Sequence, residues 1–161
     1  MTNLKVDFYL RLILIISLVA IISAYFIEYV LGHQPCNLCL IERIPYGLSI
    51  ILITLNYFFK KNEKFIILLL IITFCFSFAV SVYHLGIEQG LFEESAVCGL
   101  KNATGIISKE EILKQLQEKS VSCKDVTFRI FGLSLTSINI LLSFILIILL
   151  TKIYISYEKN K

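Results

Sequence analysis

Four uncharged apolar runs, each close to the length of a membrane-crossing helix, constrain this chain more than any other feature. They cover residues 12–27, 44–59, 65–83 and 130–151. A bilayer core takes about 20 helical residues, with a range of roughly 17–25. Isolated strands cannot cross lipid because their backbone groups would stay unpaired. The sequence therefore predicts an all-α membrane protein, a four-transmembrane-helix bundle with spans at about 10–31, 41–59, 65–84 and 131–153.

Two of these runs need a further argument. The second has 16 residues, so it reaches the length of a span only if residues 39–43 belong to the same helix. The first is longer than the ~7–15 apolar residues of a secretory signal, and no A-x-A site follows it. We therefore expect the first run to remain as a helix, within a single membrane domain covering residues 1–161.

Composition agrees with a chain that lies mostly in lipid. Hydrophobic residues make up 57% and charged residues 17%, against about 45–50% and about 25% in soluble domains. The chain is too apolar to be disordered. A net charge of +3 is too weak and too dispersed to favour nucleic-acid binding.

The charges between the spans predict an orientation. The side that would hold both termini and residues 60–64 carries eight basic and three acidic residues, and the other side seven basic and nine acidic. Basic residues near helix ends favour the cytoplasm. We therefore expect both termini in the cytoplasm and two outward-facing loops, at about 32–40 and 86–129.

The outward-facing loops hold four of the five cysteines. Cys36 and Cys39 form a C-x-x-C pair in the first loop, Cys98 and Cys123 lie in the second, and Cys75 lies inside the third span. Two pairs on the oxidising side indicate redox chemistry, although two permanent structural disulfides would give the same count. The C-x-x-C spacing favours the first interpretation, because it is typical of exchanging dithiols with a lowered thiol pKa.

Charge near the first pair supports redox chemistry. Cys39 is expected near the start of the second helix, where unpaired N–H groups favour a thiolate. Arg43 follows one turn later on the same face, and its permanent charge would stabilise a thiolate or a reduced anionic cofactor there. The alternative is an ordinary interfacial arginine with Glu42 as its solvated partner.

The position of this pair at the membrane boundary indicates which electron acceptor it can reach. The chain has no G-x-G-x-x-G or P-loop motif for a soluble cofactor. A lipid-soluble quinone is the candidate, and His84, at the outward end of the third span, can donate a hydrogen bond or a proton to a quinone oxygen. Alternatively, His84 is a polar residue at the level of the lipid headgroups.

Several segments resemble one known family. The run Cys-Asn-Leu-Cys-Leu-Ile-Glu-Arg at 36–43 resembles the C-x-L-C-x-x-x-R signature of the disulfide bond formation protein B family, DsbB. Residues 83–88 and 131–139, the second cysteine pair and the four spans are similar too, so the resemblance covers nearly the whole chain. It implies a bacterial inner-membrane enzyme, a thiol-disulfide:quinone oxidoreductase that sustains disulfide bond formation.

The resemblance also implies a reaction sequence. A Cys98–Cys123 disulfide would accept electrons from a reduced periplasmic thioredoxin-like partner of the DsbA type, with Cys98 taking the mixed disulfide. Cys123 would then exchange with Cys36, leaving Cys39 as a thiolate beside the quinone, with Arg43 holding the negative charge. Re-forming the Cys36–Cys39 disulfide would yield quinol, from either ubiquinone or menaquinone. Arg43 and His84 are then the expected quinone-binding residues, and no metal site is expected.

Two other classes of function stay open on the residues alone. The C-x-x-C pair with His33 and His84 would suit a protein that handles a soft metal or haem, although c-type haem attachment needs C-x-x-C-H and Leu40 follows Cys39. A non-catalytic membrane subunit with structural disulfides is the second alternative.

The remaining expectations concern structure. Ser108 and Glu111 form a capping box that opens a short helix through about Lys119, with an apolar stripe suited to the membrane interface or to packing. Cys75 is expected to pack as a small apolar residue. Asn56 and Asn139 are expected to form hydrogen bonds between helices.

Overall fold

A computed structural model describes residues 2–58, 63–93, 123–124, 128–130 and 132–159 of the chain. Its long helices are α1 (Thr2–Tyr29), α2 (Asn37–Phe58), α3 (Glu63–Glu88) and α6 (Leu135–Lys159). All four contain a segment that is long and apolar enough to cross a membrane. The prediction of a four-helix membrane bundle is confirmed.

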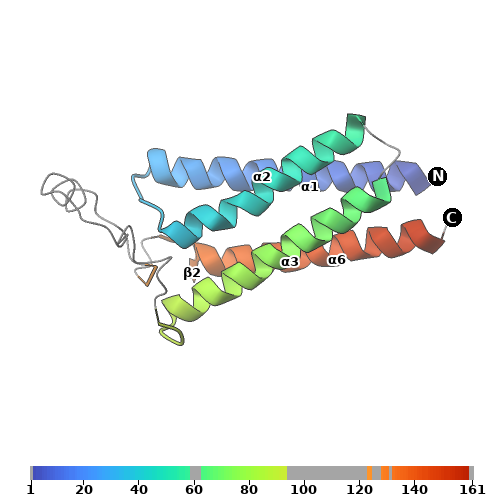
Figure 1. The fold of residues 1–161 in the computed structure, drawn as a ribbon. Helices are drawn as coiled ribbons and strands as arrows, with labels where there is room; N and C mark the ends of the chain where they lie inside the picture. The colour runs from blue at the N-terminus through green and yellow to red at the C-terminus, as the bar shows by residue number, and fades with distance from the viewer. Residues whose placement is uncertain (1, 59–62, 94–122, 125–127, 131, 160–161) are drawn as a thin grey trace, which may run out of the picture.

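The four helices run antiparallel in sequence order (Figure 1). The start of α1, the end of α2, the start of α3 and the end of α6 gather at one end of the bundle. The opposite end holds residues 30–36, the end of α3 and a short antiparallel pair of strands, β1 (Arg129–Ile130) and β2 (Leu133–Ser134). We call this opposite end the cysteine end, because Cys36 and Cys123 lie there. Gly132 allows the turn between the strands, since its φ is 84°.

The apolar core lies along the helices, away from the cysteine end. α3 packs most extensively on α6, and α2 packs on both α3 and α1. The buried residues of the core are Val6, Leu10, Ile13, Tyr46, Ile53, Ile66, Ile67, Leu70, Phe74, Leu146, Leu150 and Ile153.

Small hydroxyl side chains join the helices within this apolar interior. Ser49 of α2 donates to Ser17 of α1 over 2.8 Å, and Ser77 of α3 lies 3.0 Å from Ser143 of α6. Such small polar residues let helix backbones approach closely in lipid and hydrogen-bond across the contact. The outward faces carry large exposed apolar side chains, Ile22, Ile51 and Ile72 among them, as helices in contact with lipid require.

The start of α2 decides whether the second apolar run is long enough to span a membrane. α2 begins at Asn37, so residues 39–43 belong to the same helix. The requirement set by the 16-residue run is therefore met. Because the helix begins directly after Cys36, the cysteine pair lies at its first turn.

Some structural expectations can be checked and others cannot. Asn139 does form hydrogen bonds between helices, to Glu42 of α2 and Ser81 of α3. The buried side-chain oxygen of Asn56 has no hydrogen-bond partner among the described residues, so that expectation is not met. Cys98, and the capping box with its helix at 108–119, lie outside the described residues.

Candidate redox site

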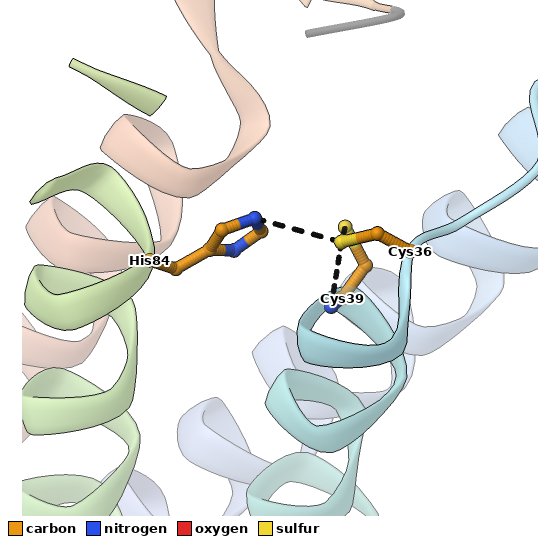
Figure 2. A group of neighbouring side chains, drawn as sticks. All are labelled: Cys36, Cys39 and His84. Carbon is orange, nitrogen blue, oxygen red and sulfur yellow. Dashed lines mark hydrogen bonds between the residues drawn. The ribbon is translucent and has the colours of Figure 1, made fainter. Parts of the chain in front are cut away.

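The first cysteine pair caps the start of α2. Cys36 and Cys39 are both free thiols with their Sγ atoms 2.9 Å apart. The carbonyl of Cys36 accepts the first helical hydrogen bond, from the N–H of Leu40, and its Sγ accepts the backbone N–H of Cys39 over 3.3 Å (Figure 2). Cys36 thus occupies the N-cap, where side chains satisfy the unpaired N–H groups of a helix.

These contacts favour a thiolate on Cys36. The pKa of Cys36 is lowered from 9.0 to about 4. The largest cause is the hydrogen bond from the Cys39 thiol; the contact with His84 and the backbone N–H of Cys39 also lower the pKa, and together they outweigh burial, which raises it. In the reduced dithiol the charge therefore lies on Cys36. The start of the helix was expected to favour a thiolate on Cys39; in the reduced pair it favours one on Cys36 instead.

His84 is buried inside the bundle near the end of α3. Its side chain is 2% exposed. Its Nε2 is 3.5 Å from the Sγ of Cys36, as Figure 2 shows, and its Nδ1 is 2.9 Å from Oε1 of Glu42 and 3.2 Å from the hydroxyl of Thr136. His84 therefore joins the cysteine pair to a buried carboxylate.

A polar network behind His84 connects three helices. Oε2 of Glu42 accepts a hydrogen bond from the amide of Asn139 over 3.0 Å, and the same amide donates to Ser81 over 2.7 Å. The hydroxyl of Tyr46 donates to the amide oxygen of Asn139. Buried polar groups in an apolar bundle are held in this way because leaving them unpaired is costly.

Arg43 is paired differently from the sequence-based expectation. Its Nη1 lies 2.5 Å from Oε2 of Glu28 at the end of α1, and its guanidinium lies 5.1 Å from the centre of the Tyr25 ring. Glu42, proposed as its solvated partner, is buried against His84 instead. The reason is helical rotation: adjacent residues of α2 project about 100° apart, so Glu42 faces α3 and α6 while Arg43 faces α1.

A cavity of about 520 Å³ lies beside the cysteine pair. This volume is within the range of about 300–1,000 Å³ typical of small-molecule sites. Cys36, Cys39, Arg43 and His84 all border it, and most of the remaining wall is apolar. The apolar wall comes mainly from α1 and α6, through Ile15, Ile16, Val19, Ala20, Ile21, Ala24, Ile27, Leu135, Ile138 and Leu142.

Cys123 also borders this cavity. It is 2% exposed and belongs to a buried cluster with Cys36, Leu38 and Ile87. The structure thus gathers three of the four cysteines singled out in the sequence, while Cys98 lies outside the described part of the chain. Cys75 is exposed on α3, away from the cavity.

Sequence reasoning did not assign roles to Glu28, Asn139 or Thr136 in this site. Glu28 interrupts the end of the first apolar run, and Glu42 lies within the length that α2 needs to span the membrane. A carboxylate at such a position is a signal in itself, because ionisable residues at membrane depth are rare and usually functional. Only the positions of the helices show which partners they meet.

The family model described as "Disulfide bond formation protein DsbB" matches residues 7–153. The chain belongs to the DsbB family. The "Disulfide bond formation protein B" of Cupriavidus pinatubonensis (strain JMP 134 / LMG 1197) is 28% identical to it over 156 residues, covering 94% of each chain. An uncharacterised protein of Rickettsia prowazekii (strain Madrid E) is 33% identical over 156 residues, covering 94% of this chain and 90% of that protein. No solved structure matches significantly.

Membership of the DsbB family and the four apolar helices establish the general role of the chain. It is a multi-pass membrane protein of disulfide bond formation, from an inner-membrane family. The family also points to an oxidoreductase role.

Proposed function

We propose that this protein is a thiol-disulfide:quinone oxidoreductase. It re-oxidises a periplasmic thioredoxin-like dithiol protein of the DsbA type and passes two electrons to a membrane quinone. One observation carries the proposal: a single, largely apolar cavity is lined by both cysteines of the first pair and by two polar side chains, Arg43 and His84.

The residues around the cavity fit a quinone. One end offers a histidine and a guanidinium for the carbonyl oxygens of a quinone ring, and the apolar walls of α1 and α6 suit the ring and the start of an isoprenoid tail. A bound quinone would supply a two-electron, two-proton acceptor. Either ubiquinone or menaquinone meets this description, since both bind through apolar contacts and a few polar groups.

Different side chains would handle the electrons, the protons and the negative charge of the reaction. When their disulfide forms, Cys36 and Cys39 together lose two electrons, and the Cys39 thiol loses its proton, since Cys36 is already a thiolate. His84, oriented by Glu42, can accept that proton or donate its own at Nε2. Arg43 supplies a positive charge near the place where negative charge develops.

The second cysteine pair connects this centre to the partner. We propose that a Cys98–Cys123 disulfide oxidises the partner dithiol, with Cys98 in the mixed disulfide. The Cys123 thiolate then attacks the Cys36–Cys39 disulfide at Cys36, releasing Cys39, and Cys98 in turn displaces Cys36 from Cys123. The net result is a reduced Cys36–Cys39 pair and a re-formed Cys98–Cys123 disulfide. The burial of Cys123 in one cluster with Cys36 supports this exchange.

The positions of the chain ends and of the basic residues indicate how the protein lies in the membrane. We propose that the protein lies in the bacterial inner membrane with the cysteine end in the periplasm and both termini in the cytoplasm. Two observations support this: both ends of the chain run to the end of the bundle opposite the cysteines (Figure 1), and basic residues predominate there.

Anaerobic reduction of a soluble quinone analogue by a reduced DsbA-type protein tests the proposal. The wild type should turn over, Cys39→Ser should abolish turnover, and Arg43→Ala should raise the apparent quinone KM by about tenfold, the effect of losing about 1.4 kcal/mol of binding. Cys75→Ser is the matched control, since Cys75 lies away from the cavity. No turnover by the wild type, with its cysteines still oxidised in the presence of the reduced partner, would contradict the proposal.

A further inference from the structure

Three soft or borderline metal ligands converge at the cysteine end. Cys36, Cys39 and His84 offer two sulfur atoms and a ring nitrogen that all lie within 4.8 Å of one another. We propose that the reduced centre binds a thiophilic divalent cation such as Zn²⁺ through the Sγ atoms of Cys36 and Cys39 and Nε2 of His84, and that the bound ion blocks re-oxidation of the pair.

The separations of the donor atoms suit such an ion. A tetrahedral zinc site, with Zn–S near 2.3 Å and Zn–N near 2.0–2.1 Å, separates sulfur from nitrogen by about 3.5 Å and two sulfurs by about 3.8 Å. Nε2 of His84 is already 3.5 Å from the Sγ of Cys36. The two sulfur atoms are 2.9 Å apart, so a small rotation of the half-buried Cys39 side chain completes the geometry.

The orientation of His84 is an independent argument for a metal. A histidine that binds a metal usually donates its other ring N–H to a carboxylate, which fixes the ring and its tautomer. Nδ1 of His84 lies 2.9 Å from Oε1 of Glu42, and Glu42 is itself held by Asn139. This arrangement leaves Nε2 directed at the cysteine pair (Figure 2).

The surrounding charges also favour a cation. Oε1 of Glu88 lies 3.9 Å from Nε2 of His84, and the side chain of Glu88 is 7% exposed. Glu42 provides a second buried carboxylate on the other side of the ring. Two carboxylates in a poorly solvated site attract a divalent ion more strongly than they would at the surface.

Binding excludes oxidation of the pair. The ion needs both sulfur atoms as thiolates. Cys36 is already a thiolate at neutral pH, so one proton, that of the Cys39 thiol, leaves to water, and neither the ion nor sulfur changes oxidation state. A Cys36–Cys39 disulfide has no thiolate to offer, so metal and disulfide are alternatives. The metal therefore inhibits the transfer of electrons out of the pair; this consequence rests on the proposed function, whereas binding itself does not.

His33 is not a ligand in this proposal, although it also borders the cavity. Its ring packs on Phe128, with 5.1 Å between the ring centres. The proposed metal site therefore uses His84 and not His33. Substituting each histidine in turn gives a matched pair of variants that tests this choice.

Cobalt binding to the intact, reduced protein tests the proposal without an activity measurement. Cys98→Ser and Cys123→Ser in the same chain remove the second thiol pair as a competing site. The expected result is one Co²⁺ per chain with a thiolate-to-cobalt charge-transfer band, displaced by Zn²⁺ and absent after Cys36 and Cys39 are oxidised. His84→Ala should weaken binding at least tenfold, and Glu42→Gln by about 10–100-fold. His33→Ala and Cys75→Ser should leave the affinity unchanged.

Several results would overturn the proposal. A charge-transfer band that survives oxidation, or an affinity that His33→Ala lowers and His84→Ala does not, would place the ion elsewhere. Glu42→Gln keeps the test valid if His84→Ala fails to fold. If Zn²⁺ binds but does not slow quinone reduction, the blocking claim is wrong. Absent quinone reduction in metal-free protein contradicts the proposed function instead, since binding is measured separately.

Discussion

Cys36 holds a position that a hydroxyl or carboxylate usually fills at the start of a helix. Its sulfur accepts a hydrogen bond from the backbone N–H of Cys39. The same sulfur lies 2.9 Å from the Sγ of Cys39 and 3.5 Å from Nε2 of His84. Three groups therefore converge on one sulfur atom. Because each of them favours negative charge, Cys36 can leave or attack as a thiolate at neutral pH.

The lowered pKa of Cys36 predicts a distinct pH dependence. In the reduced protein the alkylation rate of Cys36 should stay nearly constant between pH 8 and 6, whereas an ordinary thiol slows by about tenfold per pH unit. Cys39→Ala removes the largest cause of the low pKa, so it should raise the pKa of Cys36 and shift the profile toward the ordinary one. Mass spectrometry of alkylated Cys36 makes the measurement. An ordinary profile in the wild type would contradict this account of Cys36.

The same pKa links Cys36 to stability. Because its pKa in the folded protein, about 4, lies below the ordinary value of 9.0, the folded state favours the thiolate. The resulting stabilisation is complete above pH 9 and is lost progressively as the pH falls from 9 to 4.

Glu28 should act on the reaction through Arg43. Glu28→Gln removes the carboxylate 2.5 Å from the guanidinium, so Arg43 is no longer held toward the cavity. Because both side chains are partly exposed, at 17% and 20%, we expect a modest effect: an apparent quinone KM raised about 2–5-fold with kcat unchanged. Glu63→Gln, at the far end of the bundle, is the control. An unchanged KM in Glu28→Gln would show that the ion pair does not position Arg43.

At the scale of the helices, the first two turns of α2 organise the site. They direct Cys39 toward Cys36, Glu42 toward α3 and α6, and Arg43 toward α1. One short segment thus provides a thiol, an orienting carboxylate and a cation, each pointing in a different direction. The packing of α2 therefore sets the directions of these three side chains.

Asn139 should contribute more to stability than Asn56 does. Asn139 bonds to Glu42, Ser81 and Tyr46, and Asn139→Leu would leave the Glu42 oxygen without that donor. We expect a loss of about 1–2 kcal/mol in the free energy of unfolding. Asn56→Leu should cost less, because the side-chain oxygen of Asn56 has no partner among the described residues. Denaturant unfolding in detergent provides the comparison, and equal losses would contradict it.

The sequence predicted the helices and most of the site, but not its internal pairing. Apolar runs reveal a membrane helix because lipid requires them, and the spacing of Cys36, Cys39 and Arg43 indicated a redox centre. The partners of Glu42 and Arg43 depend on how each helix is rotated. A helix that is apolar on nearly every face does not reveal that rotation, so the Glu28–Arg43 and Glu42–His84 pairs required the structure.

At the scale of the whole molecule, the bundle separates its two ends. The cysteine end holds the redox groups and the cavity, while the opposite end gathers both chain ends (Figure 1). Between them lies an apolar core joined by serine contacts. In the proposed function, this arrangement places the thiols where a periplasmic partner can reach them and beside a cavity suited to a quinone.

Labelling with a membrane-impermeant maleimide tests this orientation. In a background with all cysteines replaced by serine, Gln89→Cys, exposed at the cysteine end, should react in intact spheroplasts. Lys64→Cys, near the start of α3, should react only after the membrane is permeabilised. The reverse pattern would contradict a periplasmic cysteine end.

A single-turnover measurement follows the transfer of electrons from the first cysteine pair to a quinone. Reduced protein carrying Cys98→Ser and Cys123→Ser is mixed anaerobically with one equivalent of a quinone analogue, and free thiols are then trapped and counted. Cys36 and Cys39 should both be lost as thiols for each quinone reduced. Quinone that stays oxidised while both thiols remain free would contradict this transfer.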